Sequence, residues 1–389
     1  MKKHIPLEKL RACVMLLFCA VLALFHTGAT AEEGDTVDSS ARSAVLIERE
    51  TGRVLLSHCP EEPLPMASTT KVMTALMALE YGRLDEMVTV GKNAYGVPGT
   101  SIYLGLGERI SLRDLLYGLM LASGNDAAVA IAEHIGGEVD TFCRMMTQRA
   151  AELGCKDTVF VNPNGLPARG HHTTAHDLAL IARQAMSYPL FREIVSTRRA
   201  SIPWEGRSYH RVLNNKNRLL STYEGATGIK TGYTRAAGRC LVFGARRDGL
   251  EVIGVVLNCG DWFDEAARLM DLAFERYELF TALDEGETLR ALPVENARQD
   301  AAYVCAGGKL CAPVEKGVVP AVEYDMPEKL EAGMHLGDTV GQARLTLNGE
   351  TVAAVPLVLR EELLYRDYAF ELERLFQHWT AVPGRALEP

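Results

Sequence analysis

Three short clusters in the chain combine residue types that could carry out nucleophilic chemistry. The first is Ser68-Thr69-Thr70-Lys71, at the expected start of a helix. Residues three apart on a helix share a face, so the Ser68 hydroxyl and the Lys71 amine can meet there. A serine hydroxyl attacks well only when a base takes its proton, and lysine can be that base if its pKa falls. Taken alone, this spacing is common, and Ser68 or Thr69 could simply cap the helix.

The other two clusters carry groups suited to binding a polar substrate. Ser123-Gly124-Asn125 lies between two helical patterns, where Ser123 could relay a proton and the Asn125 amide could bind a carbonyl. Lys230-Thr231-Gly232 ends a strand pattern. There Lys230 offers positive charge, Thr231 a hydroxyl for an anionic group, and Gly232 room for a substrate along the strand. In isolation, a capped turn and a solvated edge lysine explain these clusters equally well.

The elements that must position these clusters alternate in a recognisable order. Strand patterns occupy residues 43–48, 53–57, 228–233, 239–247 and 251–258. Helical patterns occupy residues 70–79, 112–121, 127–135, 177–186 and 264–279. Asp248-Gly249 predicts a tight hairpin between the last two strands. The order predicts an α+β fold, with an antiparallel five-stranded sheet and helices on both faces, over residues 42–283.

The rest of the chain has a different composition. Residues 32–41 are polar and acidic, and we expect a disordered lead there. Short alternating runs and many turn residues predict a small all-β domain over 284–361. Residues 362–389 are expected to form an amphipathic helix and tail, because apolar residues recur at helical spacing: Leu364, Tyr368, Leu372, Leu375, Phe376 and Trp379. This helix either packs on the β domain or associates with a membrane surface.

Composition and the amino terminus indicate the class of protein and its compartment. The 389 residues are 48% hydrophobic with a net charge of -9, which argues for a globular chain and against a nucleic-acid partner. Residues 1–31 have a basic start, an apolar run and a small-x-small end, which predicts a secretory signal peptide. The run is short for a membrane anchor, the alternative interpretation. We therefore expect an exported protein, in which Cys305 and Cys311 either form a disulfide or remain thiols.

Together, the order and spacing of the three clusters resemble those of a known family. The segments around them are similar to the D-alanyl-D-alanine carboxypeptidases, the low-molecular-mass penicillin-binding proteins: Ala67-Ser-Thr-Thr-Lys-Val-Met, Leu121-Ala-Ser-Gly-Asn-Asp and Gly228-Ile-Lys-Thr-Gly-Tyr. Asn162-Pro-Asn-Gly-Leu-Pro and Ala237-Gly-Arg-Cys-Leu-Val add to the resemblance, which covers roughly residues 42–280.

The resemblance implies a serine peptidase that removes the terminal D-alanine from peptidoglycan stem peptides. Ser68 would attack the carbonyl between the two D-alanines, Lys71 would be the general base, and water would hydrolyse the acyl-enzyme. β-Lactams would acylate Ser68 because they imitate D-Ala-D-Ala. No metal or organic cofactor is implied.

The same resemblance assigns the remaining roles. Ser123 and Lys230 would form the proton-relay and charge-stabilising side, and Asn125 would hold the substrate amide. Thr231 would share with Lys230 the binding of the terminal carboxylate. The backbone N–H groups of the nucleophile and of Tyr233 would form the oxyanion hole.

Two other functions remain open at this point. A β-lactamase would need a dedicated glutamate-activated water, and no Glu-x-x-Leu-Asn element lies between the second and third clusters. A non-hydrolytic β-lactam or peptidoglycan sensor would keep the clusters without turnover. His171, His172 and His176 also suggest a metal site, but no glutamate follows them in the zinc-protease pattern, so we expect none.

Overall fold

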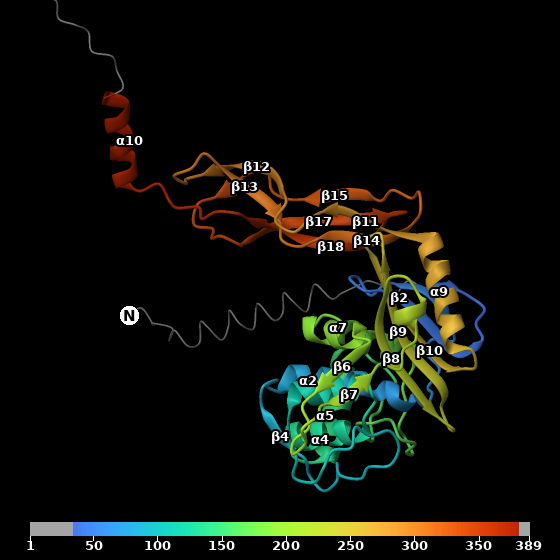
Figure 1. The fold of residues 1–389 in the computed structure, drawn as a ribbon. Helices are drawn as coiled ribbons and strands as arrows, with labels where there is room; N and C mark the ends of the chain where they lie inside the picture. Colours follow the sequence, from blue (N-terminus) through green and yellow to red (C-terminus); the bar gives the residue numbers. More distant parts are fainter. Residues whose placement is uncertain (1–33, 381–389) are drawn as a thin grey trace, which may run out of the picture. The chain divides into compact units, whose positions relative to one another are not determined.

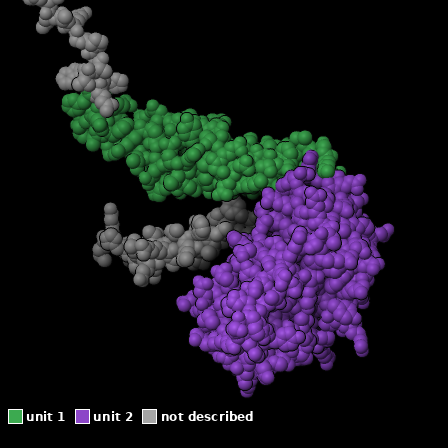
Figure 2. All heavy atoms as spheres, in the orientation of Figure 1, with its two compact units in different colours: residues 1–30, 279–389 green, residues 31–278 purple. Residues whose placement is uncertain are grey.

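The computed structural model describes residues 34–380, which divide into two compact units (Figure 1 and Figure 2). In the order of the chain, the first unit (purple in Figure 2) ends at Glu278 and the second (green in Figure 2) begins at Leu279, a few residues before the boundary expected at 284. The predicted signal peptide lies outside the described residues, as does the start of the predicted lead.

A six-stranded sheet forms the centre of the first unit. Its strands follow the order β1-β3-β2-β10-β9-β8. Their bounds are Asp35–Thr36, Val54–His58, Ala41–Glu48, Leu250–Cys259, Gly238–Arg247 and Ala226–Thr234. All neighbours are antiparallel except β1, which pairs parallel to β3. Strand β8 is the last strand at one edge, and it carries the Lys230 cluster.

The sixth strand corrects the prediction of five strands and of a disordered lead over residues 32–41. Strand β1 is only two residues long and polar, so it carries no hydrophobic alternation that a sequence pattern could reveal. Polar contacts hold it instead: Arg276 forms an ion pair with Asp35 at 2.8 Å, and the Tyr277 hydroxyl donates to the same carboxylate at 3.1 Å.

Helices cover both faces of this sheet, as predicted (Figure 1). Helix α9 (Trp262–Arg276) packs on β9 and β10 on one face, and α6 (Ala175–Ala185) packs on β2 and β10 on the other. The remaining helices are η1 (Ala67–Thr70), α2 (Lys71–Tyr81), α3 (Leu112–Met120), α4 (Asn125–Gly136), α5 (Val139–Glu152), α7 (Pro189–Ser196) and α8 (Leu219–Thr222). Two small antiparallel sheets of two strands each pair β4 (Met87–Thr89) with β5 (Arg109–Ser111) and β6 (Arg199–Ile202) with β7 (Arg211–Asn214).

Burial on both faces explains why the central strands are nearly continuous apolar runs. Val45 and Ile47 of β2 belong to the core shared with α2 to α6, while Leu46 between them points to the opposite face. The predicted hairpin joins β9 to β10, with Asp248 and Gly249 both at positive φ (48° and 89°). Such a turn matches the twist of the two strands.

Several helices were predicted close to their observed bounds, but helices α5 and α7 were not predicted, and the end of the last helix was placed wrongly. The buried residues of α5, Phe142, Cys143, Met146 and Ala150, do recur at helical spacing, but they are four of fourteen, so the segment is polar overall and was missed. The last helix ends at Arg276 rather than at 279, because strand β11 (Tyr277–Leu283) begins immediately after it.

The second unit contains the predicted all-β domain. Its larger sheet follows the order β15-β17-β18-β13-β12-β16, with bounds Ala321–Asp325, Thr339–Leu347, Glu350–Leu359, Ala301–Ala306, Thr288–Glu295 and Leu330–Glu331. Strand β11 pairs with β14 (Leu310–Glu315). Apolar residues such as Val304, Leu345 and Leu357 form its core. The Cys305 thiol donates to the carbonyl of Val358 at 3.6 Å, so it is not part of the disulfide considered above.

Helix α10 (Tyr368–Thr380) follows this domain, inside the range where an amphipathic helix was expected. Exposed apolar side chains gather on it: Tyr368 is 80% exposed and Leu375 is 64% exposed. Within residues 34–380, no helix is both long and apolar enough to cross a membrane.

Candidate active site

The first cluster lies where a short 3-10 turn continues into a helix. Ser68 belongs to η1, and Lys71 is the first residue of α2. The Lys71 side chain is completely buried, and its Nζ lies 3.1 Å from the Ser68 Oγ. The predicted spacing of three residues therefore does bring the amine to the hydroxyl.

Lys71 also bonds to two other parts of the chain. Its Nζ donates to the Oδ1 of Asn125 and to the backbone carbonyl of Asn164, both at 2.7 Å. Burial lowers the pKa of Lys71 well below its usual value, and the positive charges of Lys230 and Lys216 lower it further. This lowering of the pKa favours the neutral amine, which is the form that a general base requires.

The second cluster contributes Asn125, the first residue of α4. Its Nδ2 donates to the carbonyl of Pro98 at 2.7 Å, which fixes the direction of the amide whose oxygen meets Lys71. Ser123 lies just before it, buried and with a left-handed backbone (φ +62°). Among residues 34–380, Ser123 forms no hydrogen bond with Lys71 or Lys230, whose partners lie elsewhere.

The third cluster lies on the edge strand β8. Lys230 is 2% exposed, and its Nζ donates to the carbonyl of Thr231 at 2.9 Å. Burial, together with the charge of Lys216, lowers the pKa of Lys230 to about 7. Lys230 is thus a buried amine that is positively charged below about pH 7, and it lies next to the buried hydroxyl-bearing Thr231.

Two glycines let the backbone approach Ser68 closely. A Cβ on Gly232 would lie 2.9 Å from the backbone nitrogen of Ser68, so only glycine lets β8 lie against η1. A Cβ on Gly165, which has φ +87°, would lie 1.8 Å from the carbonyl oxygen of Ala67. The nucleophile's turn is therefore held between β8 and the 162–167 loop.

Strand β8 presents one open side next to this turn. It pairs with β9 through registers such as Gly232 with Cys240, and no other strand of the described sheet lies beyond it. Tyr233 is 65% exposed there. An edge strand with free backbone groups can pair with an extended peptide. The arrangement suits acyl transfer: a hydroxyl, a buried amine and backbone donors next to a peptide-binding edge.

Comparison with known proteins agrees with this geometry. Residues 28–260 match the family model of the D-alanyl-D-alanine carboxypeptidases. The chain belongs to this family of hydrolases. Residues 277–363 match the C-terminal domain of penicillin-binding protein 5.

Relatives of similar length belong to the same family. D-alanyl-D-alanine carboxypeptidase DacF of Bacillus subtilis is 32% identical over 351 residues, covering 87% of this chain and 90% of the relative. DacC of Escherichia coli is 31% identical, covering 88% and 90%. The crystal structure of penicillin-binding protein 5 from Haemophilus influenzae has a TM-score of 0.70 at 27% identity, covering 84% of this chain and 98% of that one.

Some residues at the site were not predicted from the sequence. The Asn164 carbonyl and Gly165 lie in the Asn-Pro-Asn-Gly-Leu-Pro segment, which was noted only as a family resemblance. Lys216, in a polar Asn-Lys-Asn segment, places a third positive charge close to the two buried lysines. A backbone acceptor leaves no side-chain signature, and a lysine between two asparagines is typical of a solvated loop.

The three histidines considered for a metal site face different partners. His172 contacts Asp157 at 2.9 Å, and His176 contacts Glu61 at 2.9 Å. The Nε2 of His171 lies 2.9 Å from the hydroxyl of Thr70. Glu61, His176 and Asp177 do gather, but Asp177 already accepts bonds from the Asp157 N–H and the Thr158 hydroxyl. That carboxylate is engaged in fixing its loop, and we assign no metal to the cluster.

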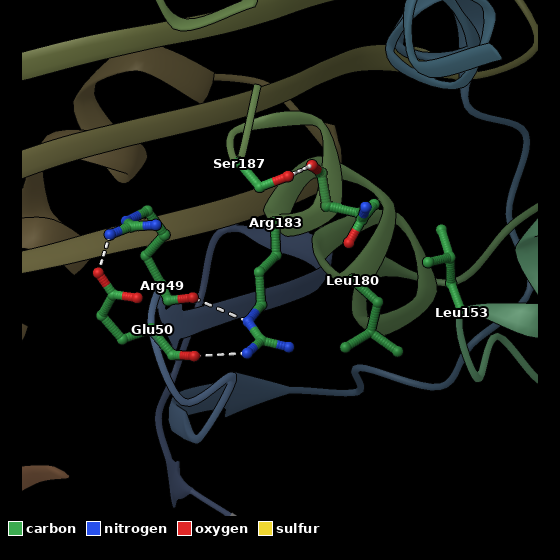
Figure 3. Close-up of a pocket in the computed structure, with 7 residues that line it drawn as sticks. Arg49, Glu50, Leu153, Leu180, Arg183 and Ser187 are labelled. Atoms are coloured by element: carbon green, nitrogen blue, oxygen red, sulfur yellow. Dashed lines mark hydrogen bonds and ion pairs between the residues drawn. The ribbon is translucent and has the colours of Figure 1, made fainter. Parts of the chain in front are cut away.

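A separate pocket contains none of the predicted site residues (Figure 3). In it, Arg183 of α6 donates to the carbonyl of Arg49 at 2.8 Å and to that of Glu50 at 2.5 Å. Figure 3 shows this guanidinium aimed at the turn between β2 and β3. The arginine therefore ties α6 to the sheet, and we interpret the pocket as structural.

Proposed function

We propose that this protein is a serine-type D-Ala-D-Ala carboxypeptidase that removes the terminal D-alanine of peptidoglycan stem pentapeptides through an acyl-enzyme on Ser68. The observation that carries the proposal is the 3.1 Å contact between the Ser68 hydroxyl and the fully buried Lys71 amine. Family membership supports the substrate class, and β-lactams are expected to acylate the same hydroxyl.

In the acylation step, neutral Lys71 takes the proton of the Ser68 hydroxyl as Oγ attacks the carbonyl between the two D-alanines. The new C–O bond gives a tetrahedral oxyanion, stabilised by the backbone N–H groups of Ser68 and Tyr233. Collapse breaks the C–N bond, and the proton passes to the leaving amine through Lys71 or Ser123. D-Alanine leaves with a neutral amine, and the acyl group remains on Ser68.

Deacylation repeats these roles with water in place of the serine. Lys71 takes a proton from water, the hydroxide adds to the ester carbonyl, and Ser68 regains its proton as it leaves. The enzyme then releases a peptide shortened by one D-alanine, and these steps use no cofactor.

Substrate recognition would fall to groups on the edge strand and on α4. The charge of Lys230 and the hydroxyl of Thr231 are suited to the terminal carboxylate, and the Asn125 amide to a substrate amide. Gly232 keeps the strand surface low enough for the peptide to lie along it. Ser123 would act only after a rotamer or substrate-induced change, because it bonds to neither lysine in this structure.

One experiment separates the carboxypeptidase from a β-lactamase and from a sensor. The mature protein is incubated with a labelled penicillin and, separately, with a peptide ending in D-Ala-D-Ala. Stable labelling together with D-alanine release supports the carboxypeptidase. Rapid penicillin hydrolysis supports a β-lactamase, and labelling without release supports a sensor.

The nucleophile is tested in the same assay by Ser68→Ala. We expect this variant to lose both labelling and release, while Ser221→Ala, an exposed serine outside the site, keeps both. Release that survives Ser68→Ala would refute the assignment of Ser68.

We further propose that the protein acts outside the cytoplasmic membrane, at the cell wall, and associates peripherally with the membrane through α10. Tyr368, Leu372 and Leu375 lie at helical spacing and are 80%, 36% and 64% exposed. Such a face suits the apolar boundary of a bilayer. The charges of Arg366, Asp367, Glu371, Glu373 and Arg374 sum to -1, so binding would depend on apolar burial rather than on anionic lipid.

Vesicle flotation tests this association. Removal of residues 362–389, or Leu375→Glu in the full chain, should abolish flotation with neutral phospholipid vesicles. Leu336→Glu is the matched control, because Leu336 is 68% exposed but lies on the β domain. Equal flotation of the full and shortened proteins would end the proposal.

A further inference from the structure

His171, first considered as a metal ligand, lies at the start of a buried hydrogen-bond chain that ends at the nucleophile's turn. Its Nε2 lies 2.9 Å from the Thr70 Oγ1, and Thr70 Oγ1 donates to the carbonyl of Ala67 at 2.9 Å. The Nδ1 of His171 accepts from the backbone N–H of Val161 at 3.0 Å. His171 is 6% exposed, Ala67 2% and Thr70 0%.

The partners determine the direction of every bond in this chain. A backbone N–H can only donate, so Nδ1 of His171 carries no proton and Nε2 carries one. Thr70 has a single hydroxyl proton, which goes to Ala67, so Thr70 must accept from Nε2. Burial lowers the pKa of His171 to about 4, which keeps the ring in this neutral form.

The end of the chain lies on the peptide group that also carries the Ser68 N–H. The Ala67 carbonyl and the Ser68 N–H belong to one planar unit, so fixing the oxygen fixes the direction of the N–H. Gly165 presses against the same oxygen, where a Cβ would come within 1.8 Å. Ala67 has a left-handed backbone (φ +49°), a conformation costly for alanine that its surroundings must maintain.

We propose that His171, acting through Thr70, is a positioning residue that aims the Ser68 N–H into the oxyanion hole. The proposal rests on the proposed acyl-transfer function. His171 touches neither substrate nor the reacting atoms; it holds the peptide group whose N–H stabilises the developing charge. The histidine is therefore required for the rate of acylation rather than for binding of the substrate.

The test uses the full mature chain and rapid-mixing kinetics with a labelled penicillin, which separate the acylation rate constant from the non-covalent dissociation constant. His171→Phe and Thr70→Val each remove the hydrogen bonds while keeping most of the volume. We expect each to lower the acylation rate constant about tenfold, less than outright loss of an oxyanion donor, with the dissociation constant unchanged. The double variant should be no slower than the slower single one, because both break the same chain.

Two further variants distinguish positioning from a general effect on folding. His171→Gln keeps one acceptor and one donor and should retain at least about a third of the parental rate. His172→Phe changes the neighbouring histidine, which bonds to Asp157 and takes no part in the hydrogen bonds from His171 to Ala67. This variant should leave the acylation rate constant unchanged. If His171→Phe does not fold, Thr70→Val and His171→Gln carry the test.

The proposal is overturned if His171→Phe or Thr70→Val is acylated at the parental rate. It is also overturned if His171→Gln lowers the acylation rate constant as much as His171→Phe does. A change confined to the dissociation constant also overturns it. A parent protein that is not labelled and releases no D-alanine refutes the proposed function itself, a failure distinct from loss of the positioning effect in an active parent.

Discussion

The two units of the chain bury different kinds of residue. In the first unit, charged and amide side chains such as Lys71, Lys230, Asn125 and Asp126 are buried together with the apolar core. In the described part of the second unit, the buried side chains are apolar apart from Thr346, the one polar residue there below 9% exposed. Burying a charged or polar group costs free energy of folding, so a cluster of such groups indicates a functional site that the fold maintains at some cost in stability. The comparison predicts that activity depends on a few buried polar contacts in the first unit.

The largest effect is expected from the buried base. Lys71→Met keeps the length and the apolar stem but removes the amine. We expect acylation by penicillin to fall at least about a hundredfold, because no other group takes the Ser68 proton. Lys92→Met, an exposed lysine in the same unit, is the control and should acylate normally. Normal acylation by Lys71→Met would show that the buried amine is not the base.

A second large effect is expected where the backbone approaches the nucleophile. Gly165→Ala places a Cβ into the carbonyl of Ala67, and should lower acylation by about tenfold to a hundredfold. Gly170→Ala is the matched control, because Gly170 has a similar φ of +84° with no neighbour within 4 Å. The control should lose about 1 kcal/mol of unfolding free energy with its acylation rate intact. Equal activity of the two variants would show that this close approach is unimportant.

The two buried lysines predict a bell-shaped pH dependence of kcat/KM for a peptide with a free terminal carboxylate. At low pH, Lys71 is protonated and cannot accept a proton, so activity rises as pH passes its lowered pKa. Lys230 loses its charge as pH rises through about 7, so carboxylate binding weakens above that point. Lys230→Arg keeps the charge, so the alkaline limb should disappear from the measurable range. An alkaline limb that persists in this variant would assign it to another group.

The smallest effect on catalysis is expected from the second unit. Leu345→Ala creates a cavity in the β domain and should lower its stability by about 2–5 kcal/mol, measured by denaturant unfolding. The acylation rate should stay within about twofold of the parent, because no polar contact of the site depends on that core. Leu76→Ala is the variant for comparison, because Leu76 is equally buried but lies on α2, the helix that follows the nucleophile's turn. It should lower acylation more than Leu345→Ala does. If Leu345→Ala impaired acylation as much as Leu76→Ala, the contrast between the units would fail.

Much of the fold and of the site could be predicted because local patterns encoded it. Ser68 and Lys71 are three residues apart on one helical face, and Asp248-Gly249 marks the hairpin that pairs β9 with β10. These signals depend only on neighbours in the sequence. The polar strand β1 was not predicted because an ion pair and a hydroxyl hydrogen bond to Asp35 hold it, rather than an apolar face.

The parts of the site that could not be predicted depend on contacts between distant segments. The Asn164 carbonyl reaches Lys71 across 93 positions, and His171 reaches Thr70 across 101. No sequence spacing predicts that a backbone carbonyl or a buried neutral histidine will lie at the site. The clusters identified the reacting groups, whereas the groups that orient them became visible only in the folded chain.

Peptide mapping of the penicillin adduct tests the central claim most directly. The mature protein is acylated with a penicillin, digested and analysed by mass spectrometry. We predict a single adduct on the peptide that contains Ser68, formed by the parent and absent from Ser68→Ala. An adduct on any other serine, or one that persists in Ser68→Ala, would contradict the account.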